Sequence, residues 1–430
     1  MRRLPLVAAA FAALLLAAGA PGAHAAGWCG GGVTSTDRPD AVTGPQLHVV
    51  YAYPYDSGGG AATWASQIVD DLEAVDAWWR GQDPTRTLRF DLAPFPGCTG
   101  LGALDLGVLQ LQATGAQLQP TDGRFEALFR EVFRAMPTLS AWKKVVVYYD
   151  GPLDDPSVCG TGGGSPGSGS DSLAAVWVSS SCEDRPERRE WVVAHEIVHA
   201  LGAPPGKEPH PYGSDTGHVG DSETDLMYPY VGDAIANAVL DMGRDDYYRH
   251  GGSWFDLATS AWLRHLDAPQ QPLAVTVSGT GTVHSDLPGV DCAASCTTQW
   301  DGGTAVTLSA RPGDGARFVG WRGGCSADPC SVVLDAPVSV EAVFGPAEVR
   351  LAARVAGKGS VTGGGISCPK RCSVRVSAGG RYPLRARPAR GWRLAGWAGA
   401  CRGTKATCAV SAEANTAVVV RFVRVKTKKR

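Results

Sequence analysis

The second half of the chain contains an internal repeat marked by cysteine. The cysteines of the first copy recur 76 residues later in three cases and 78 in the last, as Cys292/Cys368, Cys296/Cys372, Cys325/Cys401 and Cys330/Cys408. Four further cysteines are scattered over the first half, namely Cys29, Cys98, Cys159 and Cys182. Self-similarity at a fixed period means that one structural unit is built twice. The 430-residue chain therefore divides into an N-terminal half and two similar modules.

Each repeat reads as a small β module. Apolar residues alternate with polar ones in runs such as 305–308 and 338–344, and glycine-rich turns separate the runs, which predicts short antiparallel strands. A module of ~75 residues buries limited apolar area, so disulfides are expected to supplement its core. Of the three connectivities, we predict pairing of neighbours, Cys292 with Cys296 and Cys325 with Cys330. Zinc binding by four thiolates is disfavoured because no Cys-x-x-Cys pair is present.

These modules resemble the divergent bacterial repeat related to internalin B-repeats. The resemblance rests on the cysteine quartet, on Gly320-Trp321 with its counterpart Gly396-Trp397, and on a closing Val-x-Ala-Val-Phe pattern. It covers residues 273–345 and 349–423. It implies a β-grasp-like surface module that would bind a cell-wall, glycan or other surface ligand.

The N-terminus has the features of a secretory signal peptide. Arg2 and Arg3 precede an apolar run over residues 6–18, and Ala23-His24-Ala25 offers small residues at a cleavage site. The run is shorter than the roughly 20 residues needed to span a membrane. We therefore predict a signal peptide over residues 1–25 and a secreted, extracellular protein, which fits the even number of cysteines.

Formal charge gives little indication of a partner. The chain has 40 basic and 42 acidic residues, for a net charge of -2. This balance offers no broad electrostatic surface for nucleic acid or an anionic membrane, so neither is expected as a partner. The basic tail, residues 424–430, is interpreted as a solvated charge run.

Residues 27–267 alternate strand and helix signals and predict an α/β (α+β) domain with a mixed sheet. The predicted strands are 47–53, 87–92, 144–149 and 174–178, and the predicted helices are 64–79, 125–136, 190–202 and 254–266. Residues 160–170 are rich in glycine and serine and are predicted to form a flexible loop.

The strongest candidates for catalytic and metal-binding residues lie in the predicted helix 190–202, which contains His195-Glu196-Ile197-Val198-His199. A helical period of 3.6 places His195 and His199 one turn apart on one face, where both imidazoles can bind one cation. Glu196 is offset so that it can reach a metal-bound water. The pattern predicts Zn²⁺ as cofactor, because neutral imidazoles are typical zinc ligands.

A third ligand must come from beyond Gly202. Here the chain resembles the metzincin clan of metallopeptidases, in which His-Glu-x-x-His-x-x-Gly precedes a third ligand and a turn bearing Met, matched here by Met227. The clan places its third ligand three residues after the glycine, but that position is Pro205, which cannot bind metal. We interpret 203–217 as an expanded loop and choose His218, with His210 as the alternative and Asp221 as a possible carboxylate ligand.

The sequence thus predicts a metzincin-like catalytic domain with an active-site helix, followed by two small all-β disulfide-bonded domains. Its expected function is that of a secreted zinc endopeptidase acting on protein or peptide substrates, with Glu196 as general base. The alternative is a cell-surface binding or adhesion protein in which the repeats carry the function and the peptidase domain is degenerate.

Overall fold

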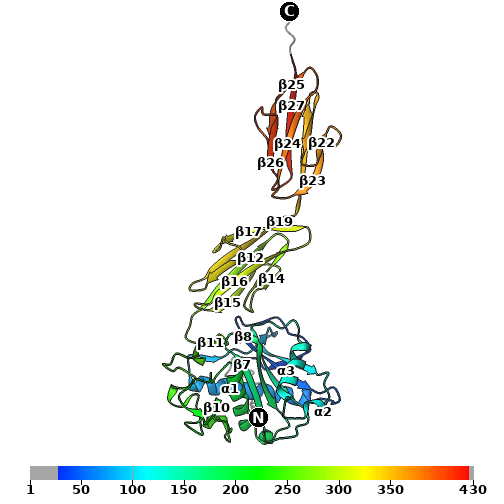
Figure 1. Cartoon of the computed structure of the whole chain (residues 1–430). Helices are drawn as coiled ribbons and strands as arrows, with labels where there is room; N and C mark the ends of the chain where they lie inside the picture. The colour runs from blue at the N-terminus through cyan, green and yellow to red at the C-terminus, as the bar shows by residue number, and fades with distance from the viewer. Residues whose placement is uncertain (1–27, 99, 426–430) are drawn as a thin grey trace, which may run out of the picture. The chain divides into compact units, whose positions relative to one another are not determined.

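The computed structural model describes residues 28–98 and 100–425, which form two compact units (Figure 1). The first unit ends at Leu266 and the second begins at Asp267. The predicted signal peptide, 1–25, and most of the basic tail lie outside the described residues. Among the described helices, none is both long enough and apolar enough to cross a membrane.

The N-terminal unit is built on a mixed seven-stranded sheet in the order β1-β5-β2-β6-β8-β7, with β4 beside β5. The strands β1, β5, β2, β6 and β8 are parallel to their neighbours, while β7 and β4 are antiparallel to β8 and β5. The sheet strands are β1 Gly31–Thr34, β2 Gln46–Tyr53, β4 Leu92–Ala93, β5 Ala103–Gln110, β6 Lys143–Tyr149, β7 Gly160–Ser165 and β8 Ser168–Trp177. The α-helices are α1 Ala61–Gln82, α2 Gly115–Leu118, α3 Arg124–Ala135 and α4 Pro186–Ala200.

Helices cover both faces of this sheet because its strands are apolar on both sides. Val49 and Val146 lie in one core with α1 and α4, whereas their neighbours Val50 and Val147 lie in a second core with α3. This alternation along each strand separates the two cores. The unit therefore has three layers, and α4 lies on the same face as α1.

Three predicted elements differ from the structure. The predicted strand 87–92 is divided into β3, Arg86–Leu88, and the separate β4. The predicted helix 254–266 is wrong: the segment contains a short 3-10 turn, Leu257–Thr259, and then β11, Leu263–His265, which pairs with β3. The predicted flexible loop 160–170 is also wrong, because it forms most of the β7–β8 hairpin.

The second unit contains two modules of the same construction. In each, one mixed and one antiparallel four-stranded sheet enclose one core. The first module has the mixed sheet β15-β12-β19-β17 and the antiparallel sheet β14-β13-β16-β18. The second has the mixed sheet β23-β20-β27-β25 and the antiparallel sheet β22-β21-β24-β26. The first module comprises β12 Gln270–Ser278, β13 Gly281–Ser285, β14 Asp291–Cys292, β15 Cys296–Asp301, β16 Ala305–Pro312, β17 Ala316–Gly323, β18 Cys330–Val333 and β19 Val338–Pro346. The second comprises β20 Glu348–Ala356, β21 Gly359–Gly363, β22 Ile366–Cys368, β23 Ser373–Ser377, β24 Arg381–Pro388, β25 Trp392–Gly399, β26 Thr407–Ser411 and β27 Thr416–Arg424. These two-sheet sandwiches replace the β-grasp-like arrangement that the repeat resemblance implied.

All twelve cysteines form disulfides. The predicted neighbour pairing in the first module is confirmed, and the second module repeats it. In the N-terminal unit, Cys29 pairs with Cys98 and Cys159 pairs with Cys182. The second of these bonds ties the entry to β7 to the segment that leads into α4.

A buried ion pair joins α1 to α4. Nε and Nη2 of Arg189 donate to the two carboxylate oxygens of Asp71 at 2.6 and 2.7 Å, and both side chains are at least 95% buried. Such a bidentate pair fixes orientation as well as distance. It therefore sets how α4 lies beside α1.

Replacing Asp71 with Asn should lower the free energy of unfolding of the N-terminal unit by about 3–5 kcal/mol, because the buried charge of Arg189 loses its bidentate carboxylate. Hydrogen exchange of α1 and α4 amides in a urea series measures the change. Asp233→Asn is the matched control, since Asp233 forms ion pairs with Arg185 and Arg188 at the surface, where such pairs contribute about 0–1 kcal/mol. Equal effects of the two substitutions would contradict the assignment.

Candidate functional site

The helix α4 presents two histidines one turn apart. Pro186 occupies its first turn, where proline fits without losing a hydrogen bond. The helix stops because Gly202 adopts φ +88°, and the amides of Gly202 and Ala203 donate to the carbonyls of His199 and Val198. This is a Schellman C-cap, in which glycine carries the left-handed conformation. The glycine of the motif thus ends the helix one turn after the second histidine.

His218 joins these histidines from a separate element. It lies on β10, Asp215–Val219, which pairs with β9, Pro211–Tyr212. Nε2 of His199 is 3.2 Å from Nε2 of His195 and 3.4 Å from Nε2 of His218. We call these three residues the histidine cluster. Their ligand atoms all lie within 4.8 Å of one another, so the group could hold a metal ion.

The outer nitrogens of two of these rings are already engaged. Nδ1 of His195 is 2.7 Å from the carbonyl oxygen of Leu226, and Nδ1 of His218 is 2.7 Å from Oδ2 of Asp215. A carbonyl or an ionised carboxylate only accepts, so both Nδ1 atoms must donate. With Nδ1 as the donor, Nε2 is the ring nitrogen left to offer a lone pair toward the centre of the cluster.

Burial keeps the helical histidines neutral. Desolvation, assisted by the nearby His218, lowers the pKa of His195 to about 4. Desolvation also holds the pKa of His199 well below its ordinary value, and both other histidines of the cluster add to the effect. Neutral imidazoles are the form that binds a metal ion.

Glu196 lies in the adjacent interior without a partner. It is 6% exposed, and within the described part of the chain its Oε2 is buried without a hydrogen bond. Burial raises the pKa of this carboxyl well above its ordinary value. A buried carboxyl with no structural hydrogen bond is costly unless it has a chemical role.

The strand β7 packs directly on this part of α4, and its glycines make that contact possible. A Cβ on Gly160 would lie 2.5 Å from Oε1 of Glu196, and one on Gly162 would lie 2.6 Å from the backbone oxygen of Glu196 and 2.7 Å from Cβ of His199. Neither glycine has a positive φ. Glycine is therefore required here for space, so that a backbone strand can lie against the helix.

A hollow of about 370 Å³ borders His199. Its wall is formed by the end of β7 and by the segment after α4, including Gly163, Pro166, Ala203 and Pro205. The hollow thus opens beside one of the proposed metal ligands, where a side chain of a substrate could be accommodated.

Met227 is fully buried in a turn that connects to both parts of the cluster. The carbonyl of Met227 accepts from the amide of Val219, next to His218, while the preceding carbonyl, of Leu226, accepts from His195. Asp225 shapes the turn, since its carboxylate accepts from the amides of Met227 and Met242 at 2.7 and 2.6 Å. Asp225 is therefore a buried structural residue.

The alternative ligands lie elsewhere. Nδ1 of His210 is 3.2 Å from both carboxylate oxygens of Asp246, and His210 belongs to a separate group with Asp221, Asp245 and Asp246. Neither His210 nor Asp221 is brought to the histidine cluster.

A further group of possible ligands comprises Asp37, His48, Asp91 and Asp105. Basic side chains already neutralise its carboxylates: Nζ of Lys143 lies 2.7 Å from Asp37 and from Asp91, and Nε of Arg38 lies 2.7 Å from Asp105. This group is therefore accounted for as a buried ion-pair network.

Three contributors to the site were missed in the sequence. Asp215 was given no role in the sequence analysis, although its position three residues before the candidate ligand His218 could have suggested a partner. The carbonyl of Leu226 carries no side-chain signal. The glycines of β7 were interpreted as a loop, but their repetition at alternate positions, 160, 162 and 164, matches the period of a strand.

Gly162→Ala should lower the free energy of unfolding by about 1–3 kcal/mol, because the new methyl group overlaps atoms of α4. Gly163→Ala is the matched control on the same strand: its Cβ would meet nothing closer than Phe125 at 3.6 Å, so a change within about 0.5 kcal/mol is expected. Urea denaturation of the oxidised proteins provides the measurement. If Gly162→Ala leaves the free energy of unfolding unchanged, β7 does not pack tightly on α4.

Comparison with known proteins identifies the second unit. Residues 272–348 and 350–426 each match the family described as the divergent InlB B-repeat domain. Both modules are divergent InlB B-repeat domains. The resemblance inferred from the cysteine quartets and the Gly-Trp pairs is therefore confirmed for the B-repeat modules. No curated protein matches the chain.

Several solved structures show a distant likeness to the chain. Catalytically inactive OgpA from Akkermansia muciniphila, in complex with an O-glycopeptide, is 11% identical, with 81% of this chain and 92% of that chain covered and a TM-score of 0.31. Wild-type OgpA is 12% identical, with 90% and 99% covered and a TM-score of 0.29. The minor pilin GBS52 of Streptococcus agalactiae is 8% identical, with 37% and 98% covered and a TM-score of 0.17. TM-scores this low establish neither a shared fold nor a shared activity.

Proposed function

We propose that the chain is a secreted zinc-dependent endopeptidase of metzincin type. The observation that carries the proposal is the convergence of three Nε2 atoms from α4 and β10 beside Glu196, whose buried Oε2 has no hydrogen bond within the described residues. Six disulfides in the described residues fit an oxidising compartment outside the cell.

The donor set fits zinc. Three neutral imidazoles with their lone pairs directed inward are the ligands of several catalytic zinc sites, which keep a further position open. The acceptors on Nδ1 of His195 and His218 supply the outer interactions that usually orient such ligands. A zinc ion bound by His195, His199 and His218 would supply Lewis-acid chemistry for hydrolysis.

Glu196 is the proposed general base. Among the described residues no group forms a hydrogen bond with its buried Oε2, and burial raises the pKa of the carboxyl so that the group can hold a proton once it accepts one. In this role Glu196 takes a proton from the attacking water and returns it to the leaving amine.

The surroundings favour an extended polypeptide as substrate. β7 is the last strand of the sheet, and within the described residues no strand pairs with its outer edge. Backbone groups on a free strand edge can bind an extended peptide by adding it as another strand. The hollow beside His199 offers space for one side chain of such a peptide.

Glu196→Gln should reduce peptide hydrolysis by about 10²–10⁴-fold, because the amide cannot accept the proton. Zinc content should stay unchanged, since Glu196 is not a proposed ligand. Cleavage of an unstructured protein, compared with metal analysis of the same sample, tests both statements. Wild-type activity in this variant would exclude Glu196 as the base.

Removing the third ligand tests the metal assignment. His218→Ala should lower bound zinc well below one equivalent, whereas His210→Ala should leave the stoichiometry intact, because His210 is bonded to Asp246 in a different group. Zinc measured after dialysis provides the readout. If only His210→Ala loses the metal, the choice between the two histidines is reversed.

A second function, attachment to a surface through the B-repeat modules, is favoured by the family match of residues 272–426. It is compatible with a peptidase, because the modules would then hold the enzyme at its substrate. It would be the main function if the Glu196→Gln and wild-type chains were equally without hydrolytic activity.

A further inference from the structure

The two B-repeat modules share a fold but have opposite charge. Residues 349–423 contain fourteen Lys and Arg residues and a single acidic one, Glu413, whereas residues 273–345 contain three basic and seven acidic residues. The nearly balanced charge of the whole chain conceals this difference. The second module is therefore the part of the chain that an anionic partner would meet most favourably.

Five arginines of the second module lie on the outer face of one sheet. Side chains alternate between the core and solvent along β20, β23, β25 and β27, and the exposed positions include Arg350, Arg354, Arg375, Arg393 and Arg421. We call these five residues the arginine face. Within the described part of the chain, the one carboxylate paired with them is that of Glu348, 4.0 Å from Arg375.

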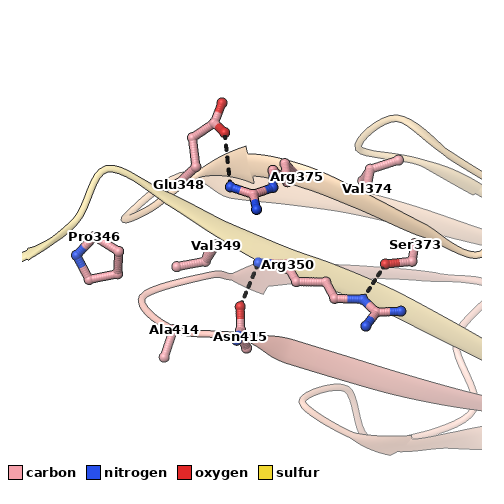
Figure 2. Close-up of a pocket in the computed structure, with 9 residues that line it drawn as sticks. All are labelled: Pro346, Glu348, Val349, Arg350, Ser373, Val374, Arg375, Ala414 and Asn415. Atoms are coloured by element: carbon pink, nitrogen blue, oxygen red, sulfur yellow. Dashed lines mark hydrogen bonds and ion pairs between the residues drawn. The ribbon is translucent and has the colours of Figure 1, made fainter. Parts of the chain in front are cut away.

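Two of these arginines are direct neighbours across strands. In the antiparallel pair of β20 and β23, Arg350 is opposite Arg375, where side chains are about 5 Å apart. Like charges in this position are destabilising unless something compensates them. Within the described residues, the Arg350 guanidinium has one side-chain partner, the neutral hydroxyl of Ser373, which lies 2.5 Å from Nε. The Arg350 guanidinium extends toward Ser373 and that of Arg375 toward Glu348, so an anionic group bound by both arginines would offset the like charges (Figure 2).

The surface at this point is hollowed, as Figure 2 shows. A hollow of about 660 Å³ is lined by polar groups that include Arg350, Arg375, Ser373 and Asn415. Asn415 accepts from the backbone amide of Arg350 at 2.7 Å through its Oδ1, which leaves its amide nitrogen as a donor. The wall of the hollow also contains the carboxylate of Glu348 and apolar side chains such as those of Val349 and Val374. Its donors, which come from two arginines, a hydroxyl and an amide, are the groups that an anionic ligand requires.

The first module shows that the fold does not need these arginines. Its strands β12 and β15 pair in the same way, and the positions corresponding to Arg350 and Arg375 hold Pro272 and Gln299. A neutral pair thus supports the same sheet.

A second position shows the same contrast. Arg354 is opposite Val419 in the second module, whereas the first module has Thr276 opposite Glu341 there. A structural role would be expected in both copies, so the basic character is specific to the second module.

We propose that the arginine face binds an anionic polysaccharide, a glycan chain with sulfate or carboxylate groups. Arginine forks bind such groups bidentately, and eleven of the fourteen basic residues of this module are arginine. The described part of the module exposes no large aromatic side chain that could stack on bases or insert into lipid. The disulfide-bonded chain would also meet polysaccharide in an oxidising, extracellular setting. This proposal does not depend on the peptidase assignment.

Binding of a heparin oligosaccharide to the full chain tests the proposal. Arg350→Gln/Arg375→Gln should weaken binding by about tenfold or more, because two charge-assisted contacts are lost. The matched control is Arg381→Gln/Arg385→Gln, which removes the same charge from exposed positions of β24 in the other sheet and should weaken binding less than about threefold. Near-UV circular dichroism of each variant checks that the module stays folded.

Four results would overturn the proposal. Absence of binding to heparin in the wild-type chain excludes the ligand class. Equal losses in the two double variants would mean that net charge alone attracts the glycan, without a site. Tighter binding to double-stranded DNA or to vesicles containing anionic lipid than to heparin would assign the surface to another class of partner. Retention of tight binding by Arg350→Gln/Arg375→Gln alone would exclude the hollow.

Discussion

The hydrogen bond from Nδ1 of His195 to the carbonyl of Leu226 is the contact on which the candidate site depends. It ties α4 to the turn of Met227, and the same turn accepts from the amide that follows His218. One short segment thereby fixes a helical histidine and a hairpin histidine relative to each other. The carboxylate of Asp225 accepts a hydrogen bond from the amide of Met227 and so fixes the turn, while the Asp71–Arg189 ion pair fixes α4 against α1.

The glycine-rich strand β7 gives the site its second wall. Because Gly160 and Gly162 have no side chains, a hydrogen-bonded strand can lie in van der Waals contact with Glu196 and His199. The same closeness removes water from Glu196, which raises the pKa of its carboxyl. The close packing of β7 and the raised pKa of Glu196 therefore depend on each other, since larger side chains on β7 would displace α4 and admit solvent.

Comparison of the two B-repeat modules distinguishes the residues that the fold requires from those that set the charge of the surface. Their core residues, disulfide pairings and strand orders correspond, while their outer faces differ in charge. Local rules predicted the short strands and the cysteine pairing that the modules share, because alternation of apolar residues and cysteine spacing act over a few residues, but they did not predict how the strands assemble into two sheets. The difference in charge between the modules can also be counted from the sequence. The strand register is needed to show that Arg350 and Arg375 are opposite each other.

The sequence by itself determined the helix that carries His195, Glu196 and His199, the division into an α/β half and two β modules, and the pairing of neighbouring cysteines in the modules. Each follows from interactions between residues close in the chain, which periodicity and spacing express. Tertiary structure alone decided that His218 joins the cluster while His210 bonds to Asp246, that residues 160–165 are a strand and not a loop, and that a backbone carbonyl orients His195. Those outcomes depend on contacts between segments distant in sequence, where the energy of packing overrides local preference.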